Sequence, residues 1–249
     1  MTSAAPNPLI IDPRTQAGAQ FLLLHDDSVL HATFVDVLKP EIEAMALAVA
    51  RCFERYQRIQ ERAAELDTDR TGLIRAFTQG ALDDLVVSTR LLLAGKLAAS
   101  GNVARQSIEG VAMALLCSTE EELVLQSRPK QGDVRGYYWQ RVRKADDRLV
   151  EGQRAVQQLE WNADVLRLHK PWITTLADVQ KRFSGLSHAG MLAVSMRMNF
   201  ETPMSLAFGG NFDPEKLDIY RADVILRAHI AIDLANVMDA LLESMRPVG

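Results

Sequence analysis

A histidine suited to proton transfer and an arginine suited to phosphate binding lie near each other in the second half of the sequence. Arg182 and His188 are separated by five residues in the stretch KRFSGLSHAG, residues 181–190, which also contains Ser184. Histidine gains and loses a proton near neutral pH, so it suits general acid or base catalysis. A guanidinium group binds phosphate oxygens and stabilises negative charge that builds on them. The stretch is therefore a candidate catalytic site for a reaction at a phosphate group.

The spacing of Arg182 and His188 resembles the Arg-x4–6-His signature of HEPN domains, which are bacterial and archaeal helical bundles. The resemblance implies RNA cleavage without a metal, often in toxin or phage-defence systems, at a site where two motifs meet across a homodimer. In such a site His188 would be the general base or acid and Arg182 would stabilise the phosphorane. Ser184 or Ser187 would help to orient the site.

A looser resemblance covers more of the chain. The segments ARQSIEGVAMALLCS (104–118) and RFSGLSHAGM (182–191) are similar to an arginine–glutamate helix and a serine–histidine helix of uncharacterised bacterial all-α families. Some of those families are linked to abortive infection. This resemblance again implies a helical domain.

Helical geometry offers an interpretation of the same stretch without catalysis. His188 follows Leu186 by two residues, so it points about 200° away from it, onto a small, uncharged face shared with Ser184. We favour this interpretation, in which the helix packs on both sides and His188 is a hydrogen-bonded interior or interface residue. Spacings of four and three, which are typical of a core stripe, link the residues of the other face: Trp172, Leu176, Val179, Phe183, Leu186, Gly190 and Ala193.

Polar residues on two other apolar segments are candidate ligand-binding residues. His229, Asp233 and Asn236 are spaced four and three, so they share one face of the final helix. Arg105 and Glu109 lie four residues apart in an earlier helix. If these side chains converge, they form a polar cavity in an apolar bundle, which would be a pocket for a small ligand. The alternative that we favour is a buried polar network that sets helix register.

Four arginines at spacings of four, three and four line one face of an early helix and are candidate contacts for an RNA backbone: Arg51, Arg55, Arg58 and Arg62. Glu54 lies four residues before Arg58, so part of this face is expected to be paired. The chain has a net charge of −4, whereas nucleic-acid binders usually have a basic excess. We therefore favour a solvated or inter-subunit face, and we expect no DNA binding.

The elements that must position these residues are almost all helical. Strand signals are nearly absent, and 3.6-residue periodicity fills the segments between glycines and prolines. The pattern predicts an irregular arm over 1–20, then one helical-bundle domain over 21–249, with about seven helices and an apolar C-terminal helix at its centre. Turns or loops are expected at 100–102, 127–133 and 202–214. The predicted helices cover 27–39, 40–66, 71–99, 103–117, 135–160, 172–199 and 215–245.

The absence of several motifs narrows the range of functions that the sequence supports. The sequence has no CxxC, HExxH or Walker motif, so we expect no metal and no cofactor. Cys52 and Cys117 lie in apolar helical contexts typical of reduced core cysteines, which favours the cytoplasm, and no apolar run is long enough to span a membrane. The sequence favours a non-catalytic module for homodimerisation or for binding a protein partner. The alternatives are an HEPN-like ribonuclease and a small-ligand-binding protein.

Overall fold

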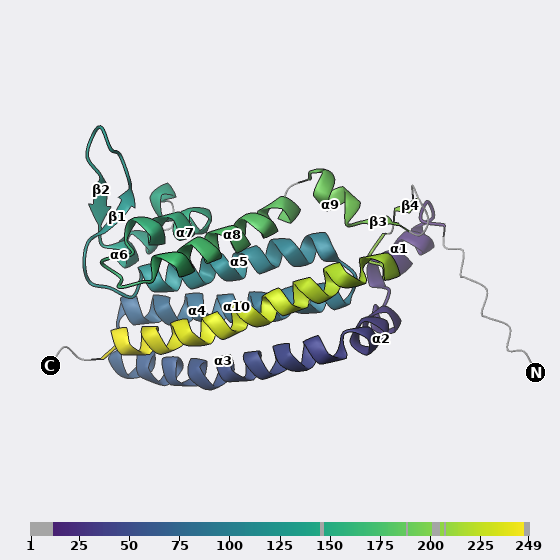
Figure 1. Cartoon of the computed structure of the whole chain (residues 1–249), viewed down its shortest axis with the longest axis horizontal. Helices are drawn as coiled ribbons and strands as arrows, with labels where there is room; N and C mark the ends of the chain where they lie inside the picture. Colours follow the sequence, from purple (N-terminus) through teal and green to yellow (C-terminus); the bar gives the residue numbers. More distant parts are fainter. Residues whose placement is uncertain (1–11, 145–146, 188, 201–204, 207, 247–249) are drawn as a thin grey trace, which may run out of the picture.

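Long helices lie side by side along the molecule and confirm the predicted all-α helical bundle (Figure 1). The computed structural model describes residues 12–144, 147–187, 189–200, 205–206 and 208–246. The body of the bundle consists of α3 (Lys39–Leu66), α4 (Asp69–Leu93), α5 (Leu97–Leu116), α8 (Lys170–Ser187) and α10 (Leu217–Ser244).

Shorter elements lie at both ends of this body (Figure 1). At the end where the chain begins lie α1 (Gln16–Leu24), α2 (Ser28–Val37), α9 (Met191–Ser195), β3 (Met198–Asn199) and β4 (Ser205–Leu206). At the other end lie β1 (Leu123–Gln126), β2 (Val134–Gly136), α6 (Tyr138–Val142), the 3-10 helix η1 (Arg148–Val150) and α7 (Gly152–Trp161). A second 3-10 helix, η2 (Pro214–Lys216), leads into α10. Each strand pair is antiparallel, with Leu123 opposite Gly136 and Met198 opposite Leu206.

Local capping signals set the ends of several helices. Thr68 caps α4 by accepting a hydrogen bond from the Thr71 amide, and the Thr71 hydroxyl accepts one from the Thr68 amide. This reciprocal pair satisfies two amide donors at the helix start. Pro40 lies in the first turn of α3, where its missing N–H costs nothing.

The turn between α4 and α5 lies earlier than predicted. It falls between Leu93 and Leu97, where Gly95 has the left-handed φ of 69° that glycine adopts without strain. The predicted turn at 100–102 is wrong, because Ser100 and Gly101 are buried inside α5. A Cβ on Gly101 would lie 2.5 Å from a methyl group of Leu186, so the glycine allows α8 to approach α5 closely.

The prediction of one exposed helix over 135–160 is also wrong. The segment forms β2, α6, η1 and α7, and Tyr138, Val150 and Leu159 are buried. The Gln158 amide is buried as well, where it donates to Leu125 O at 2.8 Å and accepts from the Tyr138 hydroxyl at 2.9 Å. These tertiary contacts with β1 outweigh the helical pattern of the local sequence.

Two more boundaries differ from the prediction. The helix expected over 172–199 ends at Ser187, and the core stripe is confirmed at Leu176 and Phe183 but does not extend to Gly190, which is exposed beyond the helix end. In the arm expected over 1–20, residues 1–11 lie outside the described residues, and α1 begins at Gln16 because Thr15 caps it.

The core centres on α5, whose last turns, residues 111–116, are entirely buried. Helix α10 packs against α3, α4 and α5, yet Ile225, His229 and Ile232 are exposed on its outer face. Helix α10 is therefore buried along one face, as its predicted central position requires, whereas its other face lies at the surface. None of the helices in the described ranges is both long and apolar enough to cross a lipid bilayer.

Candidate functional site

Arg182 is held in place by a buried carboxylate. Its Nη2 donates to Asp223 Oδ1 at 2.8 Å, which joins α8 to α10. The Arg182 side chain is 51% exposed, whereas the Asp223 side chain is 6% exposed. Asp223 also faces Arg227, whose Nη1 lies 3.6 Å from Asp223 Oδ2. One buried carboxylate therefore serves two guanidinium groups, one at the surface and one in the core.

Arg227 is fully buried, and two of its three nitrogen atoms donate hydrogen bonds. Nη1 donates to the carbonyl of Asp223 at 2.9 Å and Nη2 donates to Ser100 Oγ at 2.6 Å, whereas Nε has no partner. The guanidinium also lies 5.2 Å from the centre of the Phe183 ring. Burial lowers the pKa of Arg227. The cluster links α10 to α5 and α8, so its evident role is to hold the helices together.

Sequence analysis missed Asp223 and Arg227. Their signal was present, because they stand four residues apart in the otherwise apolar segment ADVILRAHIA, residues 222–231. Opposite charges at this spacing on a buried face indicate an internal ion pair. The third partner, Ser100, lies in the segment where the sequence predicts a turn.

The remaining catalytic candidates are less informative. His188, the predicted general base or acid, lies outside the described residues. Ser184 Oγ donates to Gln180 O at 2.8 Å and Ser187 Oγ donates to Phe183 O at 3.0 Å. Both hydroxyls therefore bond to the preceding turn of α8, a pattern that accompanies helix ends and bends.

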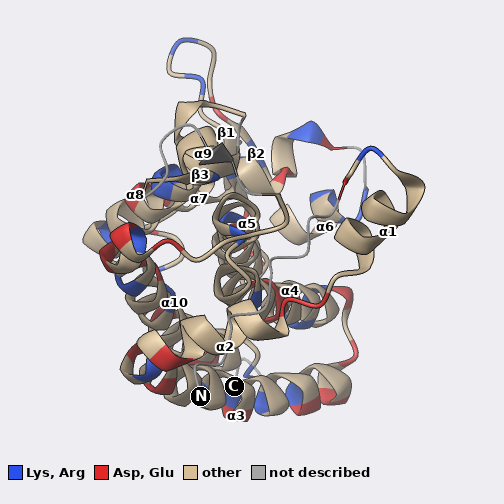
Figure 2. Cartoon of the chain, turned by 90° about the vertical axis from the view of Figure 1, so that its right-hand side faces the viewer, with Lys and Arg blue, Asp and Glu red and all other residues tan. Residues whose placement is uncertain are grey.

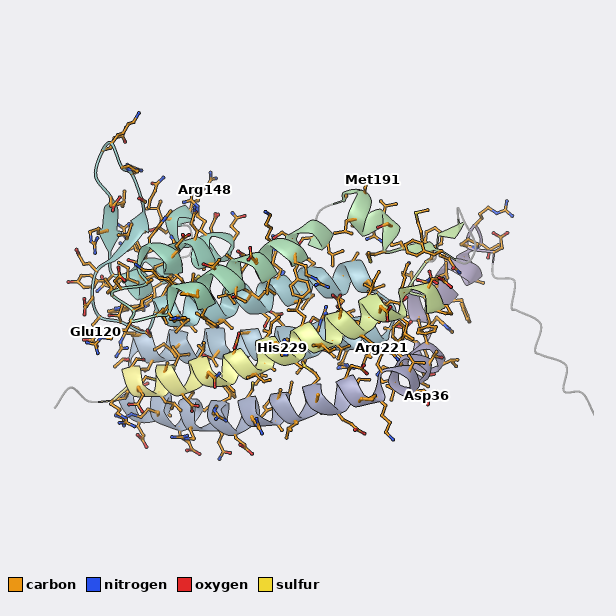
Figure 3. All side chains as sticks on the ribbon, in the orientation of Figure 1. Asp36, Glu120, Arg148, Met191, Arg221 and His229 are labelled. Carbon is orange, nitrogen blue, oxygen red and sulfur yellow. The ribbon has the colours of Figure 1, made fainter. Side chains whose placement is uncertain are left out.

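The five candidate ligand residues fall into separate contacts. Arg105 Nε lies 3.4 Å from Glu109 Oε1, which also accepts a hydrogen bond from Gln180 of α8. Asp233 instead accepts from the indole of Trp172 at 3.2 Å. His229, labelled in Figure 3, and Asn236 are exposed on the outer face of α10. The structure thus joins Arg105 to Glu109 but does not bring the five into one cavity.

The arginine stripe is divided between two roles. Arg55 Nε donates to Asp239 Oδ2 at 2.8 Å, and Arg62 Nε donates to the carbonyl of Met245 at 3.0 Å. These contacts tie α3 to α10. Arg51 and Arg58 are exposed, and only these two remain available as RNA-contact candidates.

A buried lysine fastens the chain before α10. Lys216 Nζ donates to the carbonyls of Met196 and Met198, lies 3.7 Å from Asp213 Oδ2 and sits 4.6 Å from the centre of the Phe200 ring. Burial lowers the pKa of Lys216. The lysine and the aspartate are both fully buried, so this cluster fixes β3 against the start of α10 and exposes no reactive group.

The most unusual surface lies at the end of the bundle where α1 projects. Helix α1 has large apolar side chains at four successive positions, yet Gly18 is its only buried residue. Figure 2, which looks at this end, shows α1 without a charged residue. Nearby apolar side chains extend the surface, which we call the apolar tip: Phe21, Leu22, Leu23, Leu24, Val29 and Phe208.

The apolar tip contains both projections and a groove. Leu23, Leu24 and Phe208 are 84%, 74% and 81% exposed. Leu23 and Phe208 also line a groove of about 400 Å³. Its lining includes polar side chains as well: His25, Asp26, Thr33 and the Asp27–Lys96 ion pair, whose atoms are 2.5 Å apart. Lys96 also borders a hollow of about 510 Å³, which is lined by His25, His31 and Arg90 among others.

A second apolar surface lies on α9 and is separate from the tip. Met191 and Leu192 are exposed there, and Met191 lies on the outer side of the helix in Figure 3. Figure 2 shows α9 and α1 on different sides of the same end. The groove is lined by residues of α1, α2, the 25–27 link between them, Lys96 and the 208–210 loop, so α9 does not line the groove.

No group of three or more His, Cys, Asp or Glu side chains in the described ranges is arranged to hold a metal ion. Comparison of the chain with protein-family models, with curated proteins and with solved structures finds no match.

Proposed function

We propose that this chain is a non-catalytic helical module that works by binding another protein molecule through the apolar tip. The single observation that carries the proposal is the last turn of α1, residues 21–24, where apolar side chains point to every side although Gly18 is the only buried residue of the helix. A helix that is hydrophobic all round is normally buried. The exposed apolar surface of α1 therefore indicates that another molecule covers it when bound.

The free energy available at the tip supports this function. Burying a leucine or phenylalanine side chain contributes roughly 1.5–3 kcal/mol. Leu23, Leu24, Val29 and Phe208 are each at least 74% exposed, so most of that free energy is still available for binding. Contiguous exposed apolar surface of this kind is typical of protein interaction sites.

The test is photo-crosslinking from defined positions in the full chain. p-Benzoylphenylalanine replaces Leu24 in one variant and Phe53 in a control variant, because Phe53 is also exposed and apolar but lies on α3. Both variants are expressed in the native cells and irradiated. We expect a discrete protein adduct from position 24 and none from position 53. No adduct from position 24, or equal adducts from both, would contradict the proposal.

A metal-independent ribonuclease is the second candidate. The position of the Arg182 side chain favours this function. Asp223, which is nearly buried, anchors the Arg182 guanidinium, and the guanidinium stays half exposed, as binding of a phosphate group requires. RNA degradation in EDTA should then be lost in both Arg182→Ala and His188→Ala. Equal degradation by wild type and variants, or none by any of them, removes this candidate.

A further inference from the structure

We infer that the protein bound at the apolar tip is a second copy of this chain, related to the first by a two-fold axis. The inference rests on the proposed function and names its partner. Three properties of the tip carry it: its shape, its charge and its area.

The shape of the tip suits contact with itself. A two-fold interface uses the same patch on both subunits, so each projection needs a matching hollow within that patch. Leu24 and Phe208 project, and the groove of about 400 Å³ lies next to them between α1, α2 and Gly209. A patch that had only projections, or only a groove, would fit a partner of different shape.

Charges of both signs surround the tip, since Asp26, Asp27 and Lys96 line the groove and Arg90 borders the hollow beside it. Asp27 and Lys96 form an ion pair at the groove, and Asp12 pairs with Arg14 at 2.9 Å in the turn before α1. Two copies carry identical charges, so a patch with an excess of either sign would repel itself. An anionic membrane or a nucleic acid would instead favour an uncompensated cluster of lysine and arginine. The tip has charges of both signs and no such cationic cluster, so a second copy is favoured over both.

The area of the tip fits a stable dimer. The exposed fractions of its six side chains add up to about four fully exposed side chains. At roughly 100 Å² each, they offer about 400 Å² of apolar surface per protomer. A standard interface buries about 800 Å² on each partner, of which a little over half is apolar. The tip therefore supplies the apolar part of one such interface.

The test is the mass of the full chain in solution, measured by sedimentation equilibrium over a concentration series. The monomer mass is 27.7 kDa. We expect wild type and Phe53→Glu to sediment at twice this mass at about 10 µM, and Leu24→Glu to be monomeric because two carboxylates enter each interface. Leu24 has few contacts within its own protomer, so far-UV circular dichroism should show that Leu24→Glu remains folded.

The outcomes separate this inference from the proposed function. A monomeric wild type that still gives a position-24 adduct with another protein overturns the second copy and leaves the interaction module standing. A monomeric wild type without any adduct overturns both. A dimer that survives Leu24→Glu but not Phe53→Glu uses another surface and overturns the inference. Wild-type monomers that co-sediment with phosphatidylserine vesicles, through Leu24, assign the tip to a membrane instead.

Discussion

Removing the Asp223 carboxylate should destabilise the fold far more than removing its exposed partner. Asp223→Ala leaves Arg227 buried in the core without an opposite charge, because the remaining contacts of Arg227 are to a carbonyl, a hydroxyl and an aromatic ring. Arg182→Ala removes only the half-exposed guanidinium, and Asp223 keeps its contact with Arg227. The two variants therefore remove a buried member and a half-exposed member of the same cluster.

The expected magnitudes follow from burial and distance. Unit charges 3.6 Å apart attract by about 4–5 kcal/mol at an effective dielectric constant of roughly 20. Removal of one partner of a buried pair costs about 3–5 kcal/mol, and we expect that loss for Asp223→Ala. This corresponds to a fall in melting temperature of about 10 °C for a chain of this size. Solvent screens the Arg182 pair, so Arg182→Ala should cost less than about 1 kcal/mol.

Urea unfolding followed by circular dichroism at 222 nm measures both losses, with Asp218→Ala as the control because its side chain is fully exposed. The double variant Asp223→Ala/Arg227→Met tests the cause. If the unpaired buried charge is responsible, replacing it with an apolar side chain should recover much of the lost stability. Equal losses in Asp223→Ala and Arg182→Ala, or a double variant less stable than Asp223→Ala, would refute the reasoning.

The remaining predictions concern glycine positions and alkaline stability. Gly95→Ala should lower the unfolding free energy by at least 1 kcal/mol, because φ is +69° and a Cβ would lie 2.4 Å from Asn211 O; Gly80→Ala, where nothing lies within 4 Å in a helix interior, should raise it by about 0.5–1 kcal/mol. Urea midpoints check both, and an unchanged Gly95→Ala would contradict the close approach. Burial raises the pKa of Cys52 to about 11, of Cys117 to about 12 and of Tyr220 to about 12. The unfolded chain loses these protons at lower pH than the folded chain, so stability should fall as pH rises above about 9. Cys52→Ala/Cys117→Ala should flatten that fall between pH 9 and 10, and a slope identical to wild type would refute the assignment.

The sequence by itself determined the helical class and the long helices. Helices α3 and α10 carry periodic apolar residues over many turns, and Pro40 and Thr68 provide local signals for where helices start. These signals act within a few residues of chain, so they can be read without the fold. The same holds for the two cysteines, which are free and buried as the apolar contexts predicted.

Only the tertiary structure decided where charges and apolar residues end up. Arg227 is charged yet fully buried, because α5 and α8 bring Ser100 and Phe183 to it from distant parts of the chain. Leu23 and Leu24 are apolar yet exposed, because no other part of the described chain covers α1. Residue type predicts burial only on average, and the depth of a particular side chain depends on which helices pack over it. The candidate binding surface is one of those exceptions, so it became visible only in three dimensions.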